Sequence, residues 1–394
     1  MSANDLSINQ LSTVLNAIHS QATGKTGIAV TDTSSFITVA QETLKAGYDP
    51  VLGAISAVLS RTIFSVRPYS SKFKGMMADS IRYGNHVRKL QTVDKPFEDD
   101  YRTLLVDGES IDQYAVNKPL VLQTNYYGQE TYAKSLTLFR DQLDTAFSSP
   151  EEFQRFITMV MQNASDMLEQ ARENVARATL ANFIAGKIAT EPVGGSEQVV
   201  HLLTEYNTAT GLELTDEDLA QPETFATFWK WAYARIAGIS AMMTERSLLF
   251  HTNITDKEIM RHTPADRQRV YLYNPFKFDI DAMVLSSTYH DNYLKYADKE
   301  VVNFWQSIKT PDTINVKPVY LDVDGSLVNA ESAVNQAKVF GVIFDEEAMG
   351  ITTVNQWSAP SPFNAKGGYT NLFWHETSRY WNDFSENGCV LLLD

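Results

Sequence analysis

Two aspartates give this sequence its sharpest chemical signal. Asp322 and Asp324 follow the apolar run Val319–Leu321 and precede Gly325 and Ser326. Carboxylates at this spacing after a strand suit phosphoryl transfer, in which the first attacks phosphorus and the second acts as general acid and base. The alternative is structural, because Asp-Gly is a typical turn of a β-hairpin.

The Asp-x-Asp-Gly-Ser pattern is similar to the first motif of haloacid-dehalogenase-type phosphatases, so a phosphatase using Asp322 and Asp324 is one alternative function. That motif normally opens its domain, whereas only 69 residues follow Gly325 here. No later strand ends in the paired aspartates that bind the metal in this chemistry. A calcium loop is excluded too, because Tyr320 stands where that pattern needs an acid. We therefore favour a hairpin that turns at Asp324-Gly325.

Other chemical candidates are weaker. The pairs His290-Asp291 and Asp279/Asp281 lack the third and fourth ligands that a metal site needs. No glycine loop of a phosphate-binding pattern is present. The single cysteine, Cys389, lies in an apolar run and is expected to be a buried small hydrophobe. We predict no catalytic residue, no cofactor and no metal ligand.

Composition narrows the class of protein. The chain has 394 residues, 44% of them hydrophobic, which is enough for two or three packed units with a real core. Its net charge of −15 opposes non-specific binding to nucleic acid or anionic membranes. One cysteine rules out an intrachain disulfide framework and fits a reducing compartment. We see no signal peptide and no apolar run long enough to span a bilayer.

One long helix, predicted over Ser149–Gly186, organises the chain. Ser149 can cap its first amides, Pro150 fits the first helical position, and Glu152 completes a capping box. Apolar residues then recur at helical spacing along one face, and Gly186 is a natural stop. A helix this long with one apolar stripe must lie across the rest of the protein.

A long hairpin is predicted before this helix, over Arg61–Thr137. Helical periodicity is lost there, and short alternating runs such as Tyr114–Thr124 are separated by turn pairs such as Asp107-Gly108. Its first half is basic and its second half acidic. A hairpin of this length cannot bury both faces within its own chain. It either packs on a neighbouring subunit or remains a solvated loop.

The other segments read as helices before the hairpin and as an α+β unit after the long helix. Residues 1–30 suggest a polar arm. The predicted helices cover Leu6–Ser20, Thr31–Lys45, Val51–Ser60, Pro222–Glu245, Asp256–Arg261 and Tyr289–Tyr296. The predicted strands cover Ser247–His251, Arg269–Tyr273, Met283–Ser286, Asn315–Leu321, Val339–Phe344, Tyr369–His375 and Cys389–Leu393, with a further piece around Thr352.

This order of elements resembles the major capsid proteins of tailed bacteriophages, which have the Hong Kong 97 fold. The resemblance covers nearly the whole chain after residue 30. Local phrases that look alike are Thr33–Phe36 before a helix, Leu249–Asn253 before a short helix, and Phe340–Ala348 before the last strands.

The resemblance implies an α+β Hong Kong 97-type capsid fold with four regions. Residues 1–60 would form an N-terminal arm and lead-in helices. Residues 61–137 would form the extended loop (E-loop), an extended β-hairpin that overlies a neighbouring subunit. The peripheral (P) domain would comprise 138–214 and 351–385, with the spine helix at 149–186. The axial (A) domain, an α/β unit, would comprise 215–350 and 386–394.

The resemblance also implies the function. The protein would be the major capsid protein of a tailed double-stranded DNA bacteriophage. It would self-assemble as pentamers and hexamers into an icosahedral head in the virion, after assembly in the host bacterial cytoplasm. Its partners would be copies of itself, a scaffolding protein, a portal and decoration proteins. It would enclose DNA without sequence-specific binding and would contact no membrane.

The same fold allows one alternative function and one covalent modification. An encapsulin-like nanocompartment shell protein would load protein cargo in place of DNA; the long arm, the long loop and the chain length favour the phage. Some relatives join a loop lysine covalently to a distant asparagine. Lys89 and Lys95 are the loop lysines that could do so, although no motif fixes either. Trimming residues 82–112 is expected to leave a folded protein that forms no closed shells.

Overall fold

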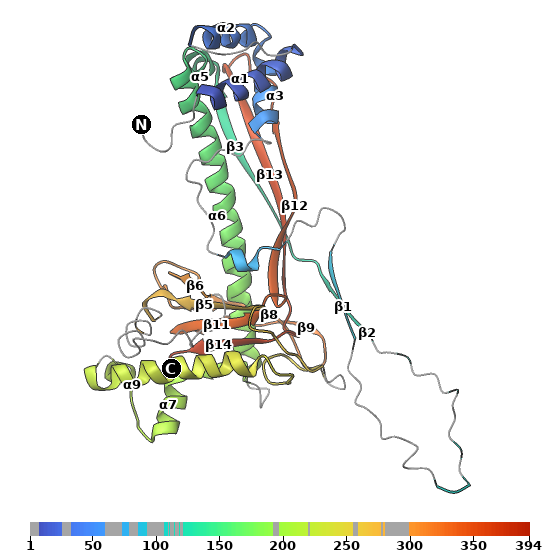
Figure 1. Cartoon of the computed structure of the whole chain (residues 1–394), viewed down its shortest axis with the longest axis vertical. Coiled ribbons are helices and arrows are strands. Elements are labelled where there is room, and N and C mark those ends of the chain that lie inside the picture. The colour runs from blue at the N-terminus through green and yellow to red at the C-terminus, as the bar shows by residue number, and fades with distance from the viewer. Residues whose placement is uncertain are drawn as a thin grey trace.

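The computed structural model shows an elongated molecule with a helical cluster at one end and a mixed α/β body at the other, joined by one long helix (Figure 1). The structure describes residues 8–25, 33–59, 73–78, 86–92, 106–108, 110, 114, 118, 121–191, 197–219, 221–254, 259–276, 279 and 299–394.

The long helix α6 spans Pro150–Thr190. At a rise of 1.5 Å per residue it is roughly 60 Å long. Its start is as predicted, since the Ser149 hydroxyl accepts a hydrogen bond from the Glu152 amide and Pro150 occupies the first turn. Its predicted end is wrong, because the helix continues one turn past Gly186. A Cβ at Gly186 would lie 2.5 Å from the Phe384 ring. This glycine therefore permits close packing and does not end the helix.

The helical cluster surrounds the first turns of α6. It contains α1 (Ile8–Thr23), α2 (Thr33–Leu44), α3 (Tyr48–Leu59) and α5 (Arg140–Ala146). The three helices predicted in this region are therefore present, with ends shifted by a few residues. Phe36, Phe147 and Phe153 pack edge to face at its centre and are almost fully buried. This core is separate from the core beneath the α/β body.

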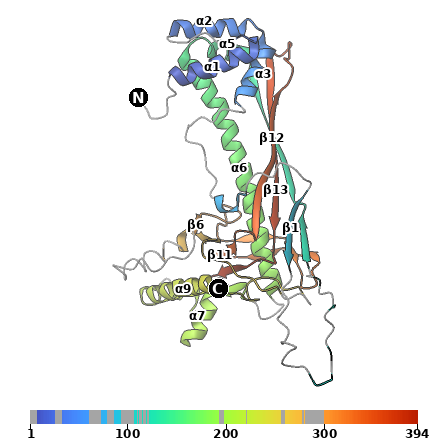
Figure 2. The ribbon, with the colours of Figure 1, turned by 45° about the vertical axis from the view of Figure 1, so that its right-hand side comes forward.

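A long antiparallel sheet runs beside α6 and connects the two ends (Figure 2). Its strand order is β12-β13-β3, with β3 at Gln129–Phe139, β12 at Met349–Pro360 and β13 at Tyr369–Asn382. Alternate residues of β13 are buried, as expected for a sheet with one covered face. The residues of β3 that were predicted as the end of the hairpin, 129–137, pair here with β13.

The α/β body is built on a second sheet with strand order β4-β14-β11-β5-β6. Strands β14 and β11, in the interior of this sheet, are mostly apolar and buried along their whole length, as is typical of a sheet covered on both faces. Val390 and Leu392 of β14 contact the core on the α6 side, whereas Cys389 and Leu391 contact the core under α9. The strands are β4 (Val199–His201), β5 (Gln268–Tyr273), β6 (Lys299–Val302), β11 (Val339–Asp345) and β14 (Gly388–Leu392).

Helices cover the outer face of this sheet. They are α7 (Leu202–Thr210), α8 (Asp216–Leu219) and α9 (Pro222–Met242). Phe228 and Trp229 of α9 are buried, and Trp229 stacks on Phe340. Short strands complete the body: β7 (Ile314–Val316) pairs with β10 (Val334–Gln336), and β8 (Val319–Leu321) with β9 (Leu327–Asn329).

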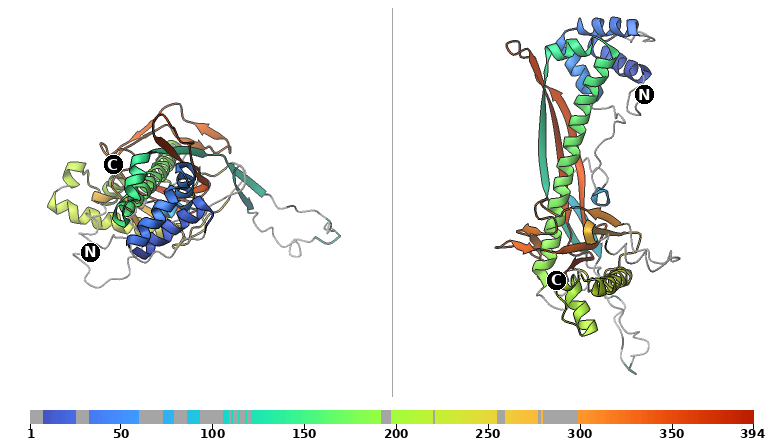
Figure 3. Two further views of the ribbon diagram at one scale, coloured as in Figure 1. Left: turned by 90° about the horizontal axis from the view of Figure 1, so that it is seen from above. Right: turned by 90° about the vertical axis from the view of Figure 1, so that its left-hand side faces the viewer.

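The predicted hairpin is present as β1 (Val87–Thr92) and β2 (Val121–Tyr126), an antiparallel pair whose register runs from Val87↔Tyr126 to Thr92↔Val121. It lies on the side of α6 away from α9 (Figure 3). Before it, the one-turn helix η1 (Lys74–Met76) contacts β12. Much of the remaining range 61–120 lies outside the described residues.

Some predicted elements of the body differ from the structure. The predicted strand Ser247–His251 is a loop with a single bridge between Ser247 and Arg261. The predicted strand Asn315–Leu321 is two strands, because Pro318 has no amide to donate to a ladder. Of the predicted helix Asp256–Arg261, the described residues 259–261 are not helical. The predictions for Met283–Ser286 and Tyr289–Tyr296 lie outside the described residues.

Candidate functional site

The two aspartates of the phosphatase alternative form a β-turn. Strands β8 and β9 pair on either side of it, the Gly325 amide donates to the Asp322 carbonyl at 2.9 Å, and Gly325 has φ +82°. The Asp324 carboxylate accepts from the Ser326 amide at 2.7 Å, and hydrogen bonding to Ser326 lowers the pKa of Asp324. A general acid needs the opposite shift. The predicted hairpin with its turn at Asp324-Gly325 is therefore confirmed.

The structure brings no set of metal ligands together among the described residues. His290, Asp291 and Asp281 lie outside the described residues. Cys389 is fully buried in β14, and burial raises the pKa of its thiol to about 12. It is thus the buried small hydrophobe that the sequence predicts. No helix of the described chain is long and apolar enough to cross a membrane.

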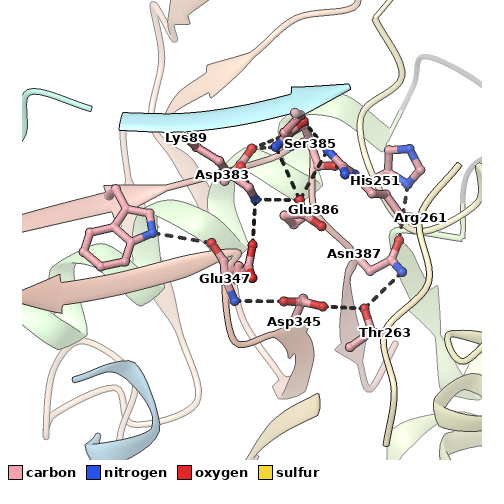
Figure 4. Close-up of polar contacts among 12 residues, drawn as sticks. Lys89, His251, Arg261, Thr263, Asp345, Glu347, Asp383, Ser385, Glu386 and Asn387 are labelled. Carbon is pink, nitrogen blue, oxygen red and sulfur yellow. Dashed lines mark hydrogen bonds and ion pairs between the residues drawn. The ribbon is translucent and has the colours of Figure 1, made fainter. Parts of the chain in front are cut away.

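A group of charged side chains lies at the base of the β1–β2 hairpin (Figure 4). The Lys89 ammonium, on β1, contacts Asp383 at 2.9 Å, Glu386 at 2.5 Å and Glu347 at 3.4 Å. The side chains of Asp383 and Glu386 are 3% and 8% exposed, whereas that of Glu347 is 52% exposed. We call these four residues the Lys89 cluster. It ties the hairpin to the turn between β13 and β14.

Further polar contacts hold the acidic side of the cluster in place. The Ser385 amide and hydroxyl both donate to Asp383, at 2.9 and 2.6 Å. The Arg261 guanidinium lies 3.3 Å from Glu386 and donates to the Ser385 carbonyl and to the Gln91 side chain. The two buried carboxylates of the cluster, Asp383 and Glu386, each have a cationic partner, as buried charges require.

These neighbours set the protonation states. Burial alone lowers the pKa of Lys89, but Asp383 and Glu386 raise it above its usual value. Burial alone raises the pKa of Asp383, but the Lys89 ammonium and the Ser385 hydroxyl bring it below its usual value. At Glu386 burial prevails, and the pKa is raised. Lys89 and Asp383 are therefore a charged pair at neutral pH.

A buried hydrogen-bond chain continues from the cluster into the body. The Glu347 amide donates to Asp345, whose carboxylate accepts from the Thr263 hydroxyl at 2.7 Å. Asn387 then bridges Thr263 and His251. The elements that meet here are β1, the end of β11 and the turn before β14. The site is thus the junction between the hairpin and the α/β body.

The sequence as a whole matches a family model. The model describes Phi29-like phage major capsid proteins, and the match covers residues 15–392. This chain belongs to that family. A phage major capsid protein is a component of the virion and associates with copies of itself to form the shell. The resemblance to the major capsid proteins of tailed phages, noted in the sequence, is confirmed.

Solved structures share the fold of this capsid protein. It is similar to a chain in the capsid structure of Staphylococcus phage Andhra, with 11% identity, a TM-score of 0.57, and coverage of 84% of this chain and 87% of that one. It is also similar to a chain in the structure of the head fibre and inner core protein of native bacteriophage P68, with 10% identity, a TM-score of 0.54 and the same coverage. The predicted Hong Kong 97-type fold is confirmed. No curated protein matches the sequence.

The cluster bears on whether Lys89 of the capsid protein could form a covalent cross-link. A lysine must lose its proton before it can attack an amide, and the carboxylates around Lys89 raise the pKa of its amine. Lys89 therefore serves this fold as a cation. Lys95 lies outside the described residues.

A second buried pair joins the spine helix of the capsid protein to the long sheet. Arg172 of α6 makes a two-pronged contact with Glu376 of β13, at 2.7 and 2.8 Å. The Tyr132 hydroxyl donates to the same carboxylate at 2.6 Å. The Glu376 side chain is fully buried. No periodicity or motif in the sequence pointed to this pair or to the Lys89 cluster.

His201 of the capsid protein clamps the far end of α6 to the last residue of the sequence. Its ring nitrogens lie 2.7 Å from Glu191 and 2.6 Å from Asp394. Burial alone lowers the pKa of His201, but hydrogen bonds from the imidazolium to Glu191 and Asp394 raise it above its usual value. The clamp is therefore complete only while His201 is protonated.

Replacing His201 by glutamine is expected to make stability less dependent on pH. Because the folded pKa lies above the unfolded value of about 6.5, the clamp contributes fully below pH 6.5. It is lost as the pH rises through the folded pKa. The loss should be at most about 1 kcal/mol, since the pair is one-third exposed. Urea unfolding of the unaltered protein and of His201→Gln at pH 5.5 and 8.5 measures this loss. If the free energy of unfolding changed equally with pH in the two proteins, the clamp would be contradicted.

Proposed function

We propose that this protein assembles as pentamers and hexamers into the icosahedral head of a tailed phage and encloses its double-stranded DNA without sequence-specific binding. Its partners are copies of itself, with a scaffolding protein, a portal and decoration proteins. Assembly takes place in the bacterial cytoplasm. Its role is structural, as its family implies, and the engagement of Asp322 and Asp324 in a turn counts against the phosphatase alternative. The family match favours the phage head over a nanocompartment shell.

We also propose that the regions have the roles implied by the resemblance. Residues 138–214 and 351–385 form the P domain around α6, and 215–350 with 386–394 form the A domain. Residues 1–60 form the arm and lead-in helices, and 61–137 the E-loop. Within the last range, β3 pairs with β13 from Gln129 onwards, so the part available to a neighbour precedes β3.

The hairpin is the observation that supports assembly best. It lies to one side of α6 (Figure 3) and is joined to the body through the Lys89 cluster at its base. Its outward residues Leu90 and Val121 are 57% and 54% exposed. A two-stranded ribbon with apolar residues in solvent is marginally stable alone and gains stability from a neighbour.

Shortening the hairpin tests this proposal. A cut at 82–112 would remove β1 and with it Lys89, so residues 93–120 are the better target. Thr92 and Val121 are a paired position of the ladder, and Asn-Gly can join them as a two-residue turn. We expect a folded protein with unchanged thermal unfolding that forms no closed shells by electron microscopy. Normal shells from this variant would refute the role of the hairpin in assembly.

A further inference from the structure

Lys187 lies in the last turn of the spine helix α6, where the helix enters the α/β body (Figure 1), and its side chain is fully buried. Its side-chain nitrogen contacts two oxygens, Gln198 Oε1 at 2.7 Å and the Phe250 carbonyl at 3.1 Å. Neither oxygen carries a charge. Among the described residues, none forms an ion pair with Lys187. An ammonium buried without a counter-ion is strongly unfavourable.

The two acceptors suit an uncharged amine. A neutral lysine has two N–H groups to donate, whereas the ammonium has three. Gln198 and Phe250 each accept one, so the ammonium would keep one N–H without an oxygen partner. The Phe183 ring, whose centre lies 5.3 Å from the nitrogen, offers only a cation–π contact in its place. Lys89, by contrast, contacts three carboxylates.

Two titratable groups near Lys187 are themselves uncharged at neutral pH. Cys389 of β14 keeps its proton, because burial raises the pKa of its thiol to about 12. Burial also lowers the pKa of His251 to about 4, and the charges of Lys187 and Arg261 act in the same direction. Neither group therefore supplies an anion to Lys187.

Two carboxylates act on Lys187 from the turn before β14. Asp383 and Glu386 favour its protonated form through space, but both contact the Lys89 ammonium. Burial outweighs them and lowers the pKa of Lys187 to about 7.

The oxygens that Lys187 contacts belong to segments that meet at the end of α6. The Phe250 carbonyl also accepts from the Gly388 amide at 2.8 Å, at the start of β14. The Gln198 carbonyl, just before β4, accepts from the Val390 amide at 2.8 Å. A Cβ at Gly388 would lie 3.5 Å from Lys187 Cε, so the segments are closely packed. We call Lys187, Gln198, Phe250 and Gly388 the Lys187 joint.

We propose that the Lys187 joint is an acid-sensitive connection between the spine helix and the α/β body, which is closed while Lys187 is an uncharged amine and loosens when Lys187 takes up a proton. An opened or unfolded chain holds this proton up to the ordinary lysine pKa of 10.5, whereas the closed joint releases it near pH 7. Opening therefore becomes easier as the pH falls from 10.5 to 7. The joint lies within one chain, so the proposal does not depend on shell assembly.

Hydrogen exchange of the unaltered full-length chain tests the joint. The amides of Gly388 and Val390 report on its opening, and the amides of Phe153 and Ile157, in the helical cluster, are the reference within the same molecule. Between pH 9 and pH 7, after correction for intrinsic exchange, opening of the joint should increase about 50-fold relative to the reference, because the opened state binds nearly one proton more. An unchanged ratio would overturn the proposal.

Lys187→Met provides the second measurement, because it removes the titrating group and keeps a buried stem of similar length. Between pH 7 and pH 9, the unfolding equilibrium constant of the unaltered protein should fall about 50-fold further than that of Lys187→Met, as measured in urea. Lys230→Met, on the exposed face of α9, is the matched control and should behave as the unaltered protein. His201 is the same in all three proteins, so its clamp does not affect the comparison.

Equal pH dependence in Lys187→Met and Lys230→Met would overturn the proposal. If Lys187→Met fails to fold, the exchange measurement on the unaltered chain decides it.

Discussion

Replacing Lys89 by methionine is expected to lower the free energy of unfolding by about 3 kcal/mol. The substitution keeps the aliphatic stem but leaves Asp383 and Glu386 buried without their ammonium partner. Removing one member of a buried ion pair costs on the order of 3–5 kcal/mol, and the 17% exposure of Lys89 places the effect at the lower end. Urea unfolding at pH 7 measures the change. Hydrogen exchange should show faster opening of the β1 amides.

Glu347→Gln is the matched control for Lys89→Met. Glu347 contacts the same ammonium, but at 3.4 Å and with a side chain that is 52% exposed. Its loss should change stability by less than about 1 kcal/mol. If Lys89→Met were as mild as Glu347→Gln, the cluster would not hold the hairpin to the body.

Replacing Arg172 by methionine is expected to destabilise the protein by about 3–4 kcal/mol. Glu376 is fully buried and would keep only the Tyr132 and Ser378 hydroxyls as side-chain partners. A two-pronged guanidinium–carboxylate contact is the strongest form of this interaction, and an uncompensated buried charge is strongly unfavourable. Chemical denaturation measures the loss. Adding Glu376→Gln should recover part of it, because the buried charge is then removed.

Arg155→Met is the control on the same helix. Arg155 pairs with Glu152, three residues before it, at 2.9 Å, but the Arg155 side chain is 77% exposed. A loss below about 0.5 kcal/mol is expected there. Equal losses for the two arginine variants would show that the Arg172–Glu376 contact does not secure the spine helix to the sheet.

Local rules predicted the elements whose causes lie within a few residues. The start of α6 follows from Ser149 and Pro150, and the β8–β9 hairpin from Asp324-Gly325. The complete burial of β14 follows from an apolar run, which a strand covered on both faces requires. In each case the residues that determine the structure are adjacent in sequence.

The remaining features depend on contacts between distant residues. Gly186 looked like a helix stop, but its lack of a side chain accommodates the ring of Phe384, 198 residues later. Lys89 and Asp383 are 294 residues apart, and no spacing rule connects them. The candidate site therefore could not be predicted from the sequence, although the hairpin that it anchors could.

Electron microscopy of the purified full-length protein, with light scattering, tests the central claim most directly. Self-association into a shell predicts closed particles, or rings of five or six copies, whose size distribution is narrow. A scaffolding protein from the same phage can be added if the chain alone stays small. Only monomers or dimers at high concentration, with scaffold present, would contradict assignment of this chain as the protein that builds the shell.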